Sequence, residues 1–396
     1  MAEERAAPGP VAGRPASRVP LTTIAREWTR IGVTGFGGPP AHIELLRRLV
    51  IEREHWMEPR EFEDAIAACN LLPGPASTQL AIFCARRLGG PAGAVVGGLG
   101  FILPAVVIIL ALSALFLGPS PPRWVRGAGA GAGSAVAAVA VAAGLGLARP
   151  SWRRARERGS ARELRWVIYA LLGGAAAALI GPWLVLVLIG CGLFEFGLTR
   201  GPALAAAAPS LPLATASVEG LGALSWVALK VGALSFGGGF VIVPLMQRDA
   251  VHTYHWMTAT GFLNAVALGQ VTPGPVVATV AAVGYAAHGV GGGVLAAVIA
   301  FAPSFLIVLL AGGQFARLRS NAGAQAFLDG AGPAAIGAIL GAAIPLTGAL
   351  AETWQFVILG AAAVALLIAR RGVVITLLTA GVAGAIVALA GGPLPG

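Results

Sequence analysis

Charged residues and cysteines are scarce in this sequence. Asp, Glu, Lys and Arg together make up 11% of the 396 residues, whereas hydrophobic residues make up 57%. This composition lies outside the range of soluble globular domains and indicates a membrane protein. The cysteines, Cys69, Cys84 and Cys191, lie in separate apolar segments without CxxC or Cys/His spacing. We therefore expect neither a disulfide framework nor a metal site.

The sequence also lacks the short motifs of common enzymes. Lys230 is the only lysine and follows Ala-Leu, so the chain contains no GxxxxGK phosphate-binding loop. HExxH, GxSxG and the cysteine spacings of haem and iron–sulfur proteins are missing as well. We therefore expect no enzyme and no cofactor, and transport driven by an ion gradient. The alternative is a membrane-embedded enzyme or scaffold in which the polar kinks are only structural.

Uncharged runs long enough to cross a bilayer recur along the chain. The run over residues 250–316 has histidines but no Lys, Arg, Asp or Glu, and must hold at least two spans. Glycine accounts for 57 residues, and together with alanine it favours helices that pack closely through small faces. The sequence thus predicts an all-α polytopic membrane protein. The other uncharged runs cover residues 65–85, 88–122, 127–148, 166–194, 330–351 and 372–396.

Arginine supplies almost all of the basic residues, and the net charge is +10. Arginines in short loops hold those loops on the cytoplasmic side of a membrane. No soluble domain presents them to nucleic acid, so we expect no nucleic-acid partner. We expect a multi-pass protein of the cell inner (plasma) membrane, surrounded by the lipid bilayer, and a homodimer is compatible with the sequence. Residues 1–20, rich in Pro, Ala and Arg, are expected to form a disordered tail rather than a signal peptide.

The chain contains an internal repeat. Residues 32–75 align with residues 232–275 without a gap. Chance similarity between apolar segments would not match Phe-Gly-Gly, His-Trp-Met and Pro-Gly-Pro in one register, so the chain is a duplication. We divide it into a first copy (residues 21–198), a linker (199–217) and a second copy (218–396). The identical pairs include Gly32/Gly232, Phe36/Phe236, Gly37/Gly237, Gly38/Gly238, Arg48/Arg248, His55/His255, Trp56/Trp256, Met57/Met257, Phe62/Phe262, Ala65/Ala265 and the whole of 73–75 and 273–275.

Loop charges indicate that the two copies have opposite orientations in the membrane. The loop over residues 149–165 is rich in arginine and should be cytoplasmic, whereas its counterpart over 348–353 carries only Glu352. The next loop shows the reverse, with Arg370 and Arg371 in the second copy and no charge at 180–182 in the first. Equivalent loops would then face opposite sides, as in inverted-repeat transporters. Arg123 and Arg126 are an exception, because they fall in a loop that this scheme places outside.

Two repeated motifs predict broken or re-entrant helices. The FGG motifs (residues 36–38 and 236–238) and the PGP motifs (73–75 and 273–275) interrupt apolar segments. Pro-Gly-Pro removes backbone donors and clashes with the preceding turn, so a helix must break there. The freed backbone groups are tolerated at membrane depth only in a protein interior or a wet cavity, and the half-helix that follows directs its positive end at the occupant. An anion is the natural occupant.

The candidate substrate-binding residues are these motifs and the polar residues beside them. A single Pro-Gly-Pro is best explained as a packing kink, but two copies in one register favour a substrate site. Lys230 is either the fixed positive charge opposite an anion or a side chain that extends to the membrane surface. Asn70 and Gln270 occupy equivalent positions before the two breaks. The full candidate set is Phe36, Gly37, Gly38, Pro73, Gly74, Pro75, Ser77, Thr78, Gln79, Lys230, Phe236, Gly237, Gly238, Gln270, Thr272, Pro273, Gly274 and Pro275.

These residues resemble the chromate ion transporter family in its two-domain form. The resemblance rests on Gly32-x-x-x-Phe36-Gly37-Gly38-Pro39-x-Ala41-His42 and Leu72-Pro73-Gly74-Pro75-x-Ser77-Thr78-Gln79 in the first copy. In the second copy it rests on Lys230-x-Gly232-Ala233-Leu234-Ser235-Phe236-Gly237-Gly238-Gly239 and Gly269-Gln270-x-Thr272-Pro273-Gly274-Pro275. The resemblance implies efflux of chromate from the cytoplasm, coupled to the membrane potential or the proton gradient, and chromate resistance. Sulfate, a tetrahedral dianion of similar size, is the competing substrate.

Overall fold

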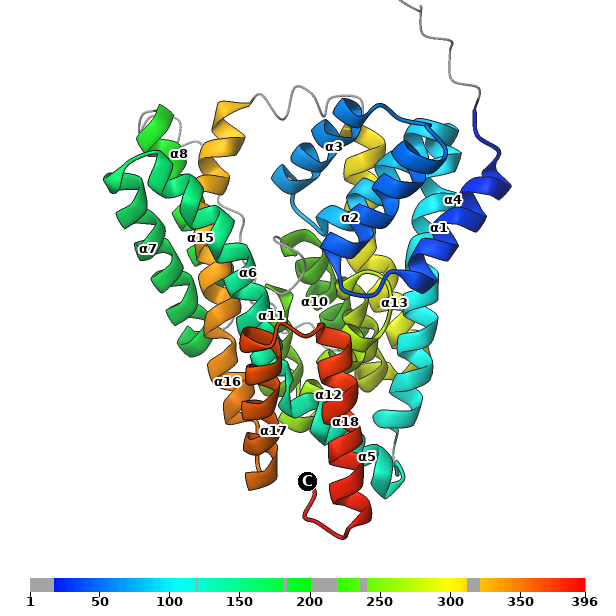
Figure 1. Ribbon diagram of the computed structural model, residues 1–396, viewed down its shortest axis with the longest axis vertical. Helices are drawn as coiled ribbons and strands as arrows, with labels where there is room; N and C mark the ends of the chain where they lie inside the picture. The colour runs from blue at the N-terminus through cyan, green and yellow to red at the C-terminus, as the bar shows by residue number, and fades with distance from the viewer. Residues whose placement is uncertain are drawn as a thin grey trace, which may run out of the picture.

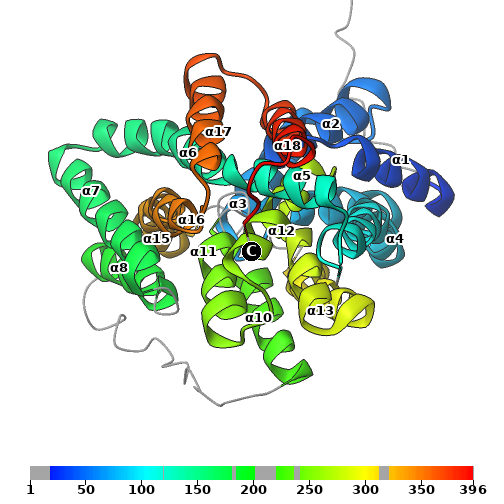
Figure 2. The ribbon, with the colours of Figure 1, turned by 90° about the horizontal axis from the view of Figure 1, so that it is seen from below.

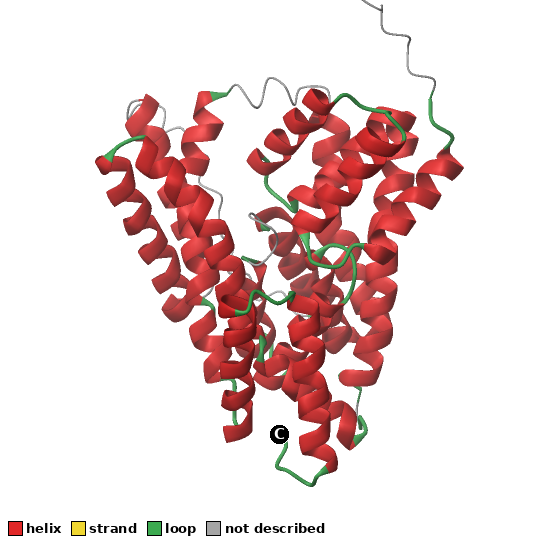
Figure 3. Ribbon diagram, viewed as in Figure 1, coloured by secondary structure: helices red, strands yellow, loops and turns green. Residues whose placement is uncertain are grey.

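The computed structural model describes residues 18–118, 120–180, 184–200, 220–235, 241–311 and 321–395. Helices are the only regular elements in these ranges, and no strand occurs among them (Figure 3). Four helical segments are long and apolar enough to cross a membrane, namely residues 76–116, 123–157, 276–310 and 322–348. The prediction of an all-α polytopic membrane protein is therefore confirmed.

Each copy begins with short helices, which lead to one much longer helix, α4 in the first copy and α13 in the second (Figure 1). The first copy consists of α1 (Leu21–Thr34), α2 (Pro39–Arg47), α3 (Pro59–Leu71), α4 (Ala76–Phe116), α5 (Arg123–Ser134), α6 (Val136–Glu157), α7 (Ser160–Ala175) and α8 (Leu184–Arg200). The second copy consists of α10 (Leu221–Leu234), α11 (Ile242–Gln247), α12 (Ala259–Val271), α13 (Val280–Ala311), α15 (Ala322–Gly341), α16 (Ala343–Gly348), α17 (Thr353–Ala363) and α18 (Val373–Leu389).

The two copies share local backbone detail as well as sequence. A π-helical turn, η1 (Arg48–Arg53), follows α2, and its equivalent η4 (Arg248–Thr253) follows α11. His55 and His255 then adopt φ values of 51° and 52°, a left-handed conformation that is uncommon for residues other than glycine. Both histidines are exposed. Each therefore shapes the turn that leads into α3 or α12.

Helices α4 and α13 each fold back on themselves. The helical course of α4 is interrupted at Gly90 (φ 67°), and that of α13 at His288 and Gly289 (φ 63°). A Cβ built on Gly284 would lie 2.5 Å from the carbonyl oxygen of Gly292, although residues eight apart in a straight helix are separated by about 12 Å. Each element is thus a hairpin, with a short arm after the PGP motif and a long arm beyond the glycine.

This reversal corrects the expectation that the uncharged run over residues 65–85 is a single span. The run is divided between α3 and the short arm of α4, and the short arm has only the fourteen residues 76–89 before Gly90. A helix of that length covers about 20 Å, which is less than the hydrocarbon thickness of a bilayer, about 30 Å. The residues of the long arm, 91–116, form the crossing helix.

Small residues allow the copies to interleave. Helix α15 of the second copy packs between α7 and α8 of the first, where Gly337 meets the carbonyl of Ala170 and Gly330 meets that of Cys191. Helix α5 of the first copy packs against α18 of the second, with Gly127 facing Gly384 (Figure 2). A Cβ on any of these glycines would collide with the partner backbone, so the expected packing through small faces is found.

Candidate functional site

The first FGG motif separates α1 from α2. Helix α1 ends at Thr34 and α2 begins at Pro39, a favourable first residue for a helix because its missing N–H would be unpaired in any case. Gly37 and Gly38 have φ values of 103° and 73°, which side chains with a Cβ rarely adopt. The two glycines are therefore required by the backbone. Phe36 is 47% exposed, so its ring is not part of the core.

The first PGP motif separates α3 from α4. Gly74 has a φ of 113°. The side-chain Nε2 of Gln79 donates to the carbonyl of Pro73 at 2.6 Å, so the first turn of α4 is hydrogen-bonded to the motif before it. Ser77, Thr78 and Gln79 occupy the first turn of α4 and are almost completely buried. The helix therefore starts with a polar turn inside the protein.

The second PGP motif separates α12 from the turn η5 (Val276–Thr279), which leads into α13. Gly274 has a φ of 99°. The hydroxyl of Thr272 donates to the carbonyl of Leu268 at 2.7 Å, and that of Thr279 donates to the carbonyl of Val276 at 2.7 Å. Both threonines are thus satisfied within their own helices.

Each PGP motif lies against the other copy. The backbone N–H of Gly274 donates to the carbonyl of Gly35, just before the first FGG motif, at 3.0 Å. A Cβ built on Gly274 would lie 3.5 Å from the carbonyl oxygen of Gly32, and one built on Gly74 would lie 3.4 Å from that of Gly232. The two motifs therefore make equivalent contacts, each with the helix before the FGG motif of the other copy, and these contacts form the centre of the candidate site.

His42 links three parts of this junction. Its Nε2 lies 2.9 Å from the carbonyl oxygen of Gly35, its Nδ1 lies 3.3 Å from the hydroxyl of Ser77, and its ring packs edge-on against Phe101. A carbonyl oxygen only accepts, so Nε2 carries the proton and Nδ1 accepts from Ser77. We did not select His42 from the sequence, although a histidine within the matched motif was the available signal.

Four buried polar atoms around the breaks have no hydrogen-bond partner among the described residues. They belong to Thr78, Gln79, Gln270 and Ser304, and each such atom costs about 1–3 kcal/mol when left unpaired. The hydroxyl of Ser304 lies 3.4 Å from a Cβ built on Gly74, so it faces the first PGP motif. Ser304 was also missed, and its signal was a lone serine in the apolar segment after Pro303.

Lys230 is held in an ion pair. Its Nζ lies 2.6 Å from a carboxylate oxygen of Asp249, and it also lies over the ring of Trp226 at 5.7 Å. Asp249 is 5% exposed, so the pair is largely shielded from solvent. The remaining candidates, Phe236, Gly237 and Gly238, lie outside the described residues.

Comparison with known proteins gives the family. The profile of the family described as Chromate transporter matches residues 22–196 and 222–388. The chain is 31% identical over 385 residues to the chromate transport protein of Pseudomonas aeruginosa, covering 90% of this chain and 89% of the relative. It is 30% identical over 341 residues to the chromate transport protein of Cupriavidus metallidurans, covering 82% of each. No solved structure matches the chain.

The two profile matches coincide with the two copies that the internal repeat defines. One lies within residues 21–198 and the other within residues 218–396, and together they cover most of the chain. The family model therefore matches the chain twice. This chain belongs to the chromate transporter family, as a two-domain member, and is a multi-pass membrane protein.

Proposed function

We propose that this protein is a secondary active transporter that exports chromate from the cytoplasm and thereby confers chromate resistance. Relatives that match most of the chain are named as chromate transport proteins. The observation that carries the proposal is the junction of the two copies, where broken helices and unpaired buried polar atoms occur together. A tetrahedral oxyanion offers acceptors to hydroxyl and amide donors that otherwise remain unsatisfied.

The substrate would bind where the PGP motifs meet the opposite copy. Thr78, Ser304 and Gln270 supply hydroxyl and amide donors from α4, α13 and α12. The N-terminal turn of α4 adds backbone N–H groups and the positive end of a helix dipole. Glycine at positions 74 and 274 leaves the backbone open to close approach. The other described candidates, which shape this site, are Phe36, Gly37, Gly38, Pro73, Pro75, Ser77, Gln79, Thr272, Pro273 and Pro275.

A mostly neutral site suits a transporter. Binding has to be favourable enough for entry and weak enough for release, and several fixed cations would hold a dianion too tightly. The pairing of Lys230 with Asp249 in a largely shielded ion pair favours a structural role for Lys230 over direct contact with the substrate. The energy source in this proposal is the membrane potential or the proton gradient.

We also propose that the two copies are inverted in the inner membrane, with the loop over residues 149–165 in the cytoplasm. Figure 1 supports this, since α5 and α6 rise through the view while their counterparts α15 and α16 descend. The breaks in each copy would then reach the middle of the membrane from opposite sides, as half-helices do in inverted-repeat transporters.

Expression in a chromate-sensitive cell tests the proposed activity. Lower intracellular chromate with an unchanged rate of chromate reduction supports export. Faster chromate reduction would instead favour a membrane-embedded enzyme. No change in either the intracellular chromate or the rate of its reduction would favour a scaffold. Everted membrane vesicles, whose cytoplasmic face points outward, distinguish the two oxyanions. Uptake of sulfate but not of chromate would make sulfate the substrate.

A further inference from the structure

A cavity of about 630 Å³ lies apart from the junction, between α3, α6, α7, α8 and α15. It can hold a hydrated oxyanion, because one water occupies about 30 Å³ of the liquid. Its wall carries four arginines: Arg154, Arg158, Arg162 and Arg165. The first copy supplies these arginines, whereas α15 of the second copy closes the opposite wall.

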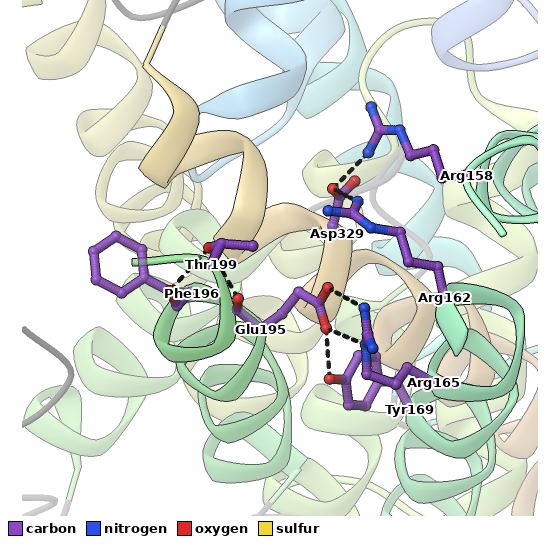
Figure 4. Close-up of polar contacts among 8 residues, drawn as sticks. All are labelled: Arg158, Arg162, Arg165, Tyr169, Glu195, Phe196, Thr199 and Asp329. Carbon is purple, nitrogen blue, oxygen red and sulfur yellow. Dashed lines mark hydrogen bonds and ion pairs between the residues drawn. The ribbon is translucent and has the colours of Figure 1, made fainter. Parts of the chain in front are cut away.

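Three of the arginines are held in place by carboxylates (Figure 4). Arg158 and Arg162 each donate to the same oxygen of Asp329, at 2.6 and 2.7 Å. Arg165 forms a two-pronged pair with Glu195, at 2.8 and 3.1 Å, and the hydroxyl of Tyr169 donates to Glu195 at 2.8 Å. These contacts fix the guanidinium groups around the cavity before any ligand arrives.

The charges of the described lining do not cancel. Four arginines face two carboxylates, Glu195 and Asp329, which leaves two positive charges. Within the described part of the chain, the side chain of Arg154 makes no ion pair or hydrogen bond. A doubly charged anion would neutralise this excess, and guanidinium groups bind the oxygens of such anions through paired hydrogen bonds.

The lining of the cavity includes a residue close in sequence to the first PGP motif. Asn70 is part of the lining and is exposed, and it follows the apolar run 65–69 at the end of α3. Pro73 follows Asn70 by three residues, which span at most about 10 Å, so a ligand beside Asn70 would lie within about that distance of the candidate substrate site. This offers a reason for a polar side chain at position 70.

We propose that this cavity, which we call the arginine vestibule, binds the divalent oxyanion on the cytoplasmic side before it enters the substrate site. This inference rests on the proposed function. The vestibule would raise the local concentration of the anion, as charged clefts do, and its effect would weaken as salt screens the charges. Arg154 would make the first contact because its guanidinium has no partner among the described residues.

The test compares Arg154→Gln with Arg153→Gln in everted vesicles. Both changes remove one positive charge from neighbouring residues of α6, but only Arg154 lines the vestibule. We expect the KM for chromate to rise about three- to ten-fold for Arg154→Gln only, as expected for loss of one partly exposed charge from a dianion site. The difference should shrink at high ionic strength. Equal KM values for the two variants would refute the vestibule. If the wild-type protein transports chromate in the same assay, the proposed function still stands.

A second variant, which is expected to lower the KM, distinguishes loss of anion binding from a folding defect. Asp329→Asn removes a negative charge and frees Arg158 and Arg162, so we expect a KM about two- to five-fold lower than that of the wild type. A raised KM would contradict the proposal. The headgroup of an anionic lipid has similar chemistry, so the assay is repeated in phosphatidylcholine proteoliposomes with and without phosphatidylglycerol. An effect of Arg154→Gln that disappears without phosphatidylglycerol would assign the cavity to lipid and refute anion entry.

Discussion

The backbone N–H of Gly274 donates a hydrogen bond to the carbonyl oxygen of Gly35 at 3.0 Å, which ties the second PGP motif to the residue before the first FGG motif. The same carbonyl lies 2.9 Å from Nε2 of His42. A buried carbonyl has two lone pairs, and here both are used. The bond therefore fixes one broken helix of each copy against the other.

His42→Phe should weaken this junction. The phenyl ring keeps the packing against Phe101 but leaves Ser77 without its partner and Gly35 with one hydrogen bond fewer. We expect a loss of about 1–3 kcal/mol in the free energy of unfolding, the cost of an unpaired buried polar group. Thermal unfolding in detergent measures it. A variant as stable as the wild type would mean that the His42 contacts contribute nothing to the fold.

Thr78→Val and Ser304→Ala should impair transport without loss of stability. Each removes a buried hydroxyl that has no partner among the described residues, so no protein hydrogen bond is lost. If the hydroxyls bind the oxyanion, the KM for chromate should rise about ten- to 150-fold, the equivalent of the roughly 1.5–3 kcal/mol of a hydrogen bond to a charged group. Thr379→Val on α18, whose hydroxyl donates to carbonyl oxygens of its own helix, is the control. Unchanged KM in both site variants would remove these hydroxyls from the site.

Lys230→Gln and Asp249→Asn, alone and together, separate two roles for Lys230. Each single variant leaves one shielded charge without its partner, so we expect its free energy of unfolding to fall by about 2–4 kcal/mol. The double variant should recover most of that loss. We expect the double variant to transport chromate at close to the wild-type rate. Loss of transport in a stable double variant would return Lys230 to the substrate site.

Cysteine labelling tests the inverted arrangement. In a variant without Cys69, Cys84 and Cys191, Arg156→Cys should react only with a reagent that reaches the cytoplasm. Ala351→Cys should react with an impermeant reagent from outside. Both positions are exposed, so a failure to label is not due to burial. Labelling of both from one side would show that the copies are not inverted.

Much of the fold could be predicted from local chemistry. Pro-Gly-Pro cannot continue a helix, so the breaks at 73–75 and 273–275 follow from the residues themselves, and the gapless alignment of the motifs reveals the duplication. The hairpins could not be predicted, because the sharp reversal at Gly90 depends on its positive φ and on packing against α1. An uncharged run has the same appearance whether it crosses a membrane or turns back.

Side-chain partners were the least predictable part of the site. Lys230 of α10 and Asp249 of η4 are 19 residues apart in the sequence, and no local pattern encodes their pairing. The arginines of the 149–165 loop were interpreted from charge alone, as markers of the cytoplasmic side. Their arrangement around a cavity depends on α15 of the second copy, which is far away in sequence.

The central claim is that chromate passes the junction of the two PGP motifs. Chromate flux into proteoliposomes tests it, with wild type, Gly74→Leu, Gly274→Leu and the control Gly360→Leu, whose position has open space around it. At Gly274 the added side chain would meet Ala105 at 2.8 Å, and at either motif it would block close approach to the backbone. We predict normal flux for the wild type and the control, and none for either motif variant, although each variant still inserts into the membrane. Wild-type flux through both motif variants would contradict the account.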